Sequence, residues 1–126
     1  MKKIYTEISA GEIVDKLTIL QIKKKKISNR QSLILIRKEY NSLFNVLKKN
    51  IKFTLKIKRL WRELLKVNSN IWEMENYKRE AQKHLEKLTK TAIEVYRNND
   101  KRAVLKQKIN KITKSNIQEV KNYSKY

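Results

Sequence analysis

Charged and amide side chains recur at helical spacing near both ends of this 126-residue sequence. Residues 12–23 contribute Glu12, Asp15, Lys16 and Lys23. Residues 95–110 contribute Tyr96, Asn99, Asp100, Arg102, Lys106 and Asn110. Side chains three or four residues apart share one face of an α-helix, so each segment predicts a polar stripe. Ala103 is small within the second stripe, which lets a ligand or a partner helix approach closely.

Several kinds of chemistry are excluded or disfavoured by residue types alone. The sequence has no Cys, so it can form neither a disulfide nor a thiolate-bound metal site. Its only His, His84, has no second His to share a metal, so we expect no metal. A single Gly cannot build a glycine-rich phosphate loop, and we expect no cofactor. No catalytic residue can be assigned.

The elements that position these stripes are predicted to be helices. The absence of Pro and the single Gly remove most turn signals, which favours an all-α fold: a small antiparallel bundle of four to five helices. We expect one domain over residues 1–126, with an extended N-terminal segment at 1–8 and a polar C-terminal tail at 115–126.

Three helix starts are predicted by capping residues. Ser9 and Glu12 fit a capping box, in which the Glu12 carboxylate reaches back to the Ser9 N–H. A second helix is expected to open at Ser28–Asn29, and a third near Thr54. Residues 98–100, Asn-Asn-Asp, either cap a fifth helix or interrupt a long fourth one.

The chain resembles, over nearly its whole length, a family of small bacterial and phage proteins classed as a domain of unknown function. Residues 8–23 match its motif I-S-x-G-E-x-x-D-K-L-T-I-L-x-I-K, and residues 95–110 match V-Y-x-x-N-D-x-R-A-x-L-K-x-x-I-N. A central L-W-x-I-E-D motif appears as residues 71–76, which adds Trp72 and Glu75 to the candidate site. The E-x-K-S-Y-like tail begins at Glu119, with Asn in place of Ser. The resemblance implies no activity, because the family has no established function.

The family pattern implies that the polar residues of the first and last helices meet across the bundle. The resulting cluster is either a site for an anionic ligand or an ion-pair network that fixes the packing. We interpret the protein first as a binding module for an anionic small molecule, such as a phosphorylated metabolite, or for nucleic acid. A structural, assembly or partner-binding protein is the alternative. A small metal-free enzyme of the chorismate mutase type is a third reading, so enzymatic activity stays open.

The net charge of the chain bears on which molecules it attracts. The sequence has 32 Lys and Arg against 12 Asp and Glu, a formal net charge of +20. Lys, Ile and Asn are abundant and have A/T-rich codons, so the charge reflects either codon composition or selection for binding. Whatever its origin, the charge predicts weak, sequence-indifferent nucleic-acid binding. No segment approaches about 18 uninterrupted apolar residues, so we expect no membrane span and a cytoplasmic location. Homo-oligomer formation stays open.

Overall fold

The computed structural model describes residues 1–121, which form four α-helices and no strand. The helices are α1 (Ala10–Lys26), α2 (Arg30–Asn50), α3 (Leu55–Glu80) and α4 (Leu85–Thr113). The prediction of an all-α bundle is therefore confirmed. Residues 1–9 and 115–121 are not helical, and residues 122–126 of the expected polar tail lie outside the described part of the chain.

The predicted caps Ser9 and Asn29 begin α1 and α2, and Thr54, near which a third helix was predicted to start, caps α3. The side chains of Ser9, Asn29 and Thr54 each accept a hydrogen bond from the backbone N–H three residues later, at 3.2, 2.9 and 3.2 Å. The reciprocal half of the predicted capping box is wrong. Instead of returning to Ser9, the Glu12 carboxylate pairs with the Lys106 ammonium of α4, where a full positive charge attracts it more strongly than an N–H.

A fifth helix is absent from residues 1–121, because α4 continues through residues 98–100. The Asn98 side chain donates to the Glu94 carbonyl at 2.8 Å, so it bonds to its own helix and caps nothing. Asn98 is also buried against α3 and cannot turn outward to end a helix. The upper end of the predicted helix count is therefore wrong, and the four-helix reading is correct.

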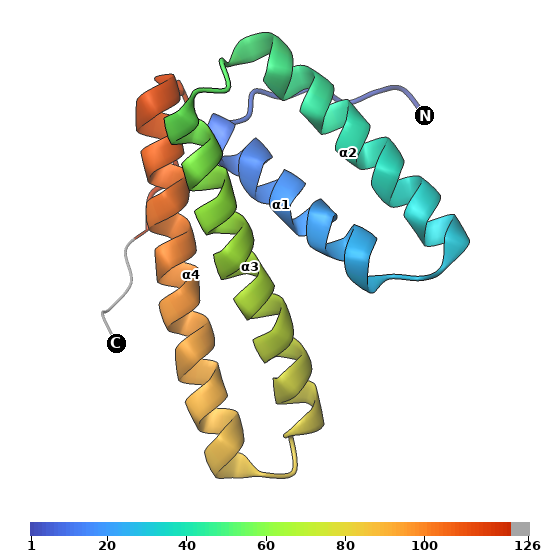
Figure 1. The fold of residues 1–126 in the computed structure, drawn as a ribbon, viewed down its shortest axis with the longest axis vertical. Coiled ribbons are helices and arrows are strands. Elements are labelled where there is room, and N and C mark those ends of the chain that lie inside the picture. The colour runs from blue at the N-terminus through green and yellow to red at the C-terminus, as the bar shows by residue number, and fades with distance from the viewer. Residues whose placement is uncertain (122–126) are drawn as a thin grey trace.

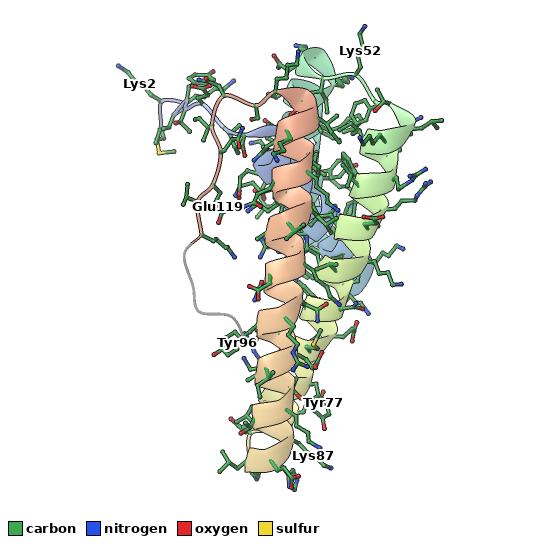
Figure 2. The ribbon with its side chains drawn as sticks, turned by 90° about the vertical axis from the view of Figure 1, so that its left-hand side faces the viewer. Lys2, Lys52, Tyr77, Lys87, Tyr96 and Glu119 are labelled. Carbon is green, nitrogen blue, oxygen red and sulfur yellow. The ribbon has the colours of Figure 1, made fainter. Side chains whose placement is uncertain are left out.

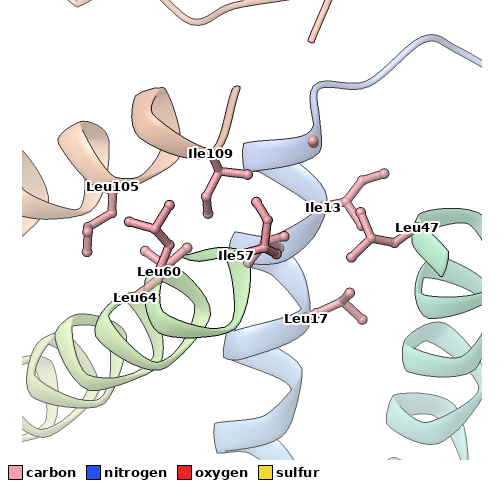
Figure 3. Packing of buried hydrophobic residues seen from close by; sticks show 10 residues of the cluster. Ile13, Leu17, Leu47, Ile57, Leu60, Leu64, Leu105 and Ile109 are labelled. Carbon is pink, nitrogen blue, oxygen red and sulfur yellow. The ribbon is translucent and has the colours of Figure 1, made fainter. Parts of the chain in front are cut away.

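The helices form two hairpins that meet at α1. Figure 1 shows α2 along one side of α1 and the α3–α4 pair on the other. The α3–α4 hairpin is the longer one, and in Figures 1 and 2 its far end extends beyond the other two helices. The apolar core fills the region where all four helices approach (Figure 3). Its most buried members are Val14, Leu17, Leu47, Ile57, Leu64 and Ile109.

A row of aromatic rings packs the connection between α2 and α3 against the core. Tyr40, Phe44, Phe53 and Trp61 follow one another with ring centroids 5.9, 5.8 and 6.3 Å apart. The Trp61 indole N–H donates to the Gln21 side chain of α1 at 2.8 Å. Such aromatic contacts add to burial, so this run holds the start of α3 in a fixed position relative to α1.

Candidate functional site

The first turn of α1 lies directly against α4. The Gly11 N–H donates to the Asn110 side-chain oxygen at 2.7 Å, and the Ala10 N–H donates to the Ser115 hydroxyl at 3.1 Å. A Cβ added at Gly11 would collide with the Lys106 carbonyl oxygen and would stand 2.7 Å from the Asn110 oxygen. The single glycine of the chain therefore permits close approach of two helices, a role that its sequence context does not reveal.

Asp15 and Arg102 form a bidentate ion pair between α1 and α4. The Arg102 Nε and Nη2 groups donate to the two Asp15 carboxylate oxygens at 2.7 and 2.5 Å. The Asp15 side chain is 1% exposed and that of Arg102 is 29% exposed. Asn68 of α3 donates to Asp15 at 2.9 Å and to the Thr18 hydroxyl at 2.8 Å. Three helices therefore contribute to the environment of one buried carboxylate.

A second pairing lies one turn further along α4. The Lys106 ammonium contacts the Glu12 carboxylate at 2.7 Å and the Glu119 carboxylate at 2.9 Å. The Lys106 side chain is 11% exposed, so most of its length is removed from water. Glu119 belongs to the segment after α4, and its contact brings that segment back onto the helix. We call Glu12, Asp15, Arg102, Lys106 and Glu119 the junction cluster.

Charge pairing sets the ionisation of this cluster. Burial raises the pKa of the Asp15 carboxyl, but hydrogen bonds from Arg102 and Asn68, with the nearby positive charges, hold the pKa below its ordinary value. Burial also lowers the pKa of the Lys106 ammonium, but its bonds to Glu12 and Glu119 outweigh burial and raise it. Lys106 in turn lowers the pKa of Glu119. Each of these shifts favours the charged form, so Asp15, Lys106 and Glu119 are charged at neutral pH.

The junction cluster has three carboxylates for two cations, so its formal charge is −1. Within residues 1–121, no buried side-chain nitrogen or oxygen lacks a hydrogen-bond partner. These features are typical of an ion-pair network between helices. An anion that entered the centre of the cluster would have to displace a carboxylate that is already in place.

Other predicted site residues lie outside the junction cluster. Lys16 is exposed and Lys23 half-buried, and neither makes an ion pair with any residue from 1 to 121. Asn99 is half-buried one turn before Arg102, whereas Tyr96 is 47% exposed. Asp100 lines a groove between α3 and α4. These residues lie on the same helices as the junction cluster. The ion pairs between α1 and α4, however, involve only Arg102 and Lys106 of α4.

Two more predicted residues, Trp72 and Glu75, meet Arg102 around a pocket of about 340 Å³ between α1, α3 and α4. Its apolar walls are Ile19, Ile22, Ile71 and Trp72. Its polar lining consists of Asn68, Glu75, Asn76, Arg79 and Arg102. The pocket borders the junction cluster, since Arg102 and Asn68 belong to the surroundings of both.

The structure adds residues that the sequence analysis does not assign to a site, among them Thr18, Asn68 and Arg79. A signal for Asn68 exists: it continues the buried stripe of α3 after Ile57, Leu60 and Leu64, at a position where an apolar residue is expected. Arg79 carries no such signal, because an arginine on a lysine-rich helix is unremarkable in sequence.

Comparison with protein-family models, with curated proteins and with solved structures found no match. The resemblance to the family of unknown function therefore stays a prediction. In residues 1–121, no helix combines the length and apolar character needed to cross a membrane. The same residues contain no group of three or more His, Cys, Asp or Glu side chains that could hold a metal ion.

Proposed function

We propose that the protein binds a small anionic ligand with a flat ring in the pocket between α1, α3 and α4. The observation that carries the proposal is the convergence of Trp72, Glu75 and Arg102 on one pocket. These residues come from two segments that the sequence analysis selected independently of any structure.

Arg102 is positioned for such a ligand by Asp15. A guanidinium has five N–H donors, and the ion pair to Asp15 uses one each from Nε and Nη2. The buried carboxylate fixes the orientation of the guanidinium, so little side-chain entropy is lost when its remaining donors bind a ligand. Because Asp15 neutralises much of the Arg102 charge, a second cation is needed, and Arg79 of α3 supplies it in the lining of the same pocket.

The remaining lining narrows the class of ligand. The Trp72 indole and three isoleucines offer apolar surface on which a planar ring can stack. The Asn76 amide provides a polar contact at the edge. The Glu75 carboxylate, which pairs with Lys78 at 3.6 Å, would accept a hydrogen bond from an N–H or O–H of the ring and would not face the anionic group. A volume of about 340 Å³ lies at the small end of the range for metabolite pockets. A phosphorylated or carboxylated metabolite with one ring system fits these features.

The sequence left two interpretations of the polar residues, an ion-pair network and a ligand site, and we assign each to a different part of the structure. The junction cluster itself serves as the structural ion-pair network, and the pocket beside it serves as the binding site. A chorismate mutase-like enzyme would clamp two carboxylates between cations on the helices around the pocket, whereas the α1 side of this pocket is apolar and its two arginines, Arg79 and Arg102, serve one anionic group in this proposal. We therefore propose binding without catalysis, in the cytoplasm, where phosphorylated metabolites are abundant.

The test compares Arg79→Gln with Lys83→Gln, which has the same charge change but lies in the turn between α3 and α4. Arg79 is exposed and makes no ion pair with residues 1–121, so its removal should leave the fold intact. Thermal melts are recorded with and without millimolar phosphate, citrate or adenosine monophosphate. The proposal predicts that ligand raises the Tm of wild type and Lys83→Gln, and that Arg79→Gln loses most of this shift. If ligand raises the Tm of both variants equally, the effect is general screening of positive charge, and the proposed binding site is contradicted.

A further inference from the structure

We infer that the α2–α3 connection and the outward face of α3 form a surface that binds the phosphate backbone of nucleic acid. This surface is separate from the ligand pocket and goes beyond the proposed function. It consists of six exposed cations, called here the basic surface: Lys52, Lys56, Lys58, Arg59, Arg62 and Lys66.

The charge of the chain is segregated along the sequence. Residues 16–66 contain sixteen Lys and Arg but only two acidic residues, Glu39 and Glu63, and the other ten acidic residues lie elsewhere. Codon bias enriches lysine, but it does not remove acidic residues from one segment and retain them in another. Within this segment, residues 52–66 contain six Lys and Arg and one acidic residue, Glu63, so the basic surface has a local excess of positive charge.

The cations of the basic surface are unpaired. None of the six makes an ion pair with a residue of the described chain 1–121, whereas Arg102 and Lys106 are each paired with at least one carboxylate. Lys56 and Lys58 also lie in the first turns of α3, which has no acidic residue in its first turn. Positive charges there oppose the helix dipole and lower helix stability slightly. Residues that contradict a local stability rule are typical of functional surfaces.

Helix geometry aligns these charges. Lys58, Arg62 and Lys66 recur every four residues, with Arg59 beside them, on the side of α3 opposite the buried Ile57. Figure 2 shows nitrogen-tipped side chains extending from this outer side of α3 into solvent. Lys66 also borders a groove of about 550 Å³, to which α4 contributes Lys101 and Lys108; Glu63 and Asp100 line it too, so three cations face two carboxylates there. The row on α3 and the two lysines on α4 offer several contacts to consecutive phosphates.

Nucleic acid suits this surface better than a lipid bilayer does. Helices that bind membrane interfaces insert an apolar face, and Leu55 is the one large exposed hydrophobic residue between residues 52 and 66. The aromatic rings nearby, Phe53 and Trp61, are half-buried in the core, so they are not displayed for stacking on bases. Lysine-rich contacts to phosphates without base contacts predict binding that is indifferent to sequence.

Two charge-matched triple variants of the full chain test the inference. One carries Lys52→Gln, Lys56→Gln and Lys58→Gln on the basic surface. The control carries Lys83→Gln, Lys87→Gln and Lys90→Gln, three exposed lysines at the far end of the α3–α4 hairpin. Affinity for a random-sequence DNA duplex is measured by fluorescence anisotropy from about 50 to 200 mM salt, a range over which phosphate contacts weaken strongly.

The inference predicts that the wild type loses about a hundredfold or more of its affinity over this salt range. The basic-surface variant should bind about tenfold or more weakly than wild type at low salt, with a salt slope shallower by about two to three. The control should stay within about twofold of the wild type. Equal weakening in both variants would show that net charge alone attracts DNA and would overturn the inference. Tighter binding to anionic lipid vesicles than to the duplex at equal salt would also overturn it.

Discussion

The junction cluster and the basic surface use the same side chains in opposite ways. In the junction cluster, Arg102 and Lys106 are mostly buried, and each contacts at least one carboxylate within 3 Å. On the basic surface, Arg59 and Arg62 lie in water and make no ion pair with residues 1–121. The composition of the chain therefore does not show whether a given Lys or Arg is buried in an ion pair or exposed to solvent.

Pairing and burial, more than charge itself, therefore separate the cations that stabilise the helix junction from the cations available to nucleic acid. A buried charge that loses its partner destabilises the protein strongly, whereas an exposed one has little effect. Substitutions in the junction cluster should therefore lower stability much more than substitutions on the basic surface.

Arg102→Ala should lower the free energy of unfolding by about 3 kcal/mol, because it leaves the Asp15 carboxylate buried without its ionic partner. Urea unfolding followed by circular dichroism measures the change. The matched control is Arg62→Ala, for which we expect a change within about 0.5 kcal/mol. Similar losses in both variants would remove the distinction between the two regions.

Gly11→Ala should lower the free energy of unfolding by about 2 kcal/mol, because the added methyl group meets the Lys106 backbone carbonyl of α4. A backbone atom in a helix cannot move aside as a flexible side chain can. Gly→Ala inside a helix otherwise stabilises by about 0.5–1 kcal/mol, so the sign of the change in urea unfolding is decisive. A stabilised variant would mean that α1 and α4 do not approach so closely.

Asn68→Ala should lower the free energy of unfolding by about 1–2 kcal/mol, because Asp15 and the Thr18 hydroxyl both lose a buried donor. The matched control is Asn70→Ala, two residues along the same helix but exposed. Chemical denaturation of both variants should give a clear difference. If Asn70→Ala proves as harmful as Asn68→Ala, the loss comes from the helix and not from the junction cluster.

Acid should destabilise the protein partly through Asp15. Its folded-state pKa lies below the ordinary value of 3.8, so the unfolded chain takes up the proton first as the pH falls. The stability due to this pairing is complete above the unfolded-state pKa and is lost as the pH falls through the folded-state pKa. Unfolding free energies from about pH 5 downward should therefore fall more steeply for wild type than for Asp15→Asn. Parallel curves would contradict the assignment.

The smallest effect is expected at the start of α3. Lys56→Gln and Lys58→Gln each remove a positive charge near the helix N-terminus, which should leave stability unchanged or raise it by a few tenths of a kcal/mol. Thermal melts at low salt are the most sensitive measurement. A clear loss of stability would mean that these two lysines stabilise the fold, and it would contradict their assignment to a surface that binds nucleic acid.

Local sequence signals predicted much of the fold. Ser9, Asn29 and Thr54 act through backbone groups three residues away, so their capping roles can be read from the sequence alone. Contact between the first and last helices was also predicted, and the Asp15–Arg102 pair between α1 and α4 confirms it. The prediction at residues 98–100 was wrong, because Asn and Asp are common helix caps and the sequence does not show that packing buries Asn98 within α4.

The candidate site was harder to predict, because it depends on how the helices cross. Gly11 is informative only when the Lys106 carbonyl is known to lie beside it. Arg79 and Trp72 share a pocket wall with Arg102 only because α3 passes α4 at a particular rotation. Helical spacing assigns residues to faces, but the contact between faces follows from packing of the whole core.

The separation between the two sets of cations is tested most directly by melting two variants with and without a DNA duplex at low salt. Arg102→Gln changes the junction cluster, and the Lys52, Lys56 and Lys58 triple Gln variant changes the basic surface. We predict that Arg102→Gln has a lowered Tm without DNA but keeps the stabilisation that DNA confers, whereas the triple variant keeps the wild-type Tm and loses most of that stabilisation. A lowered Tm in the triple variant, or a loss of the DNA effect in Arg102→Gln, would contradict the account.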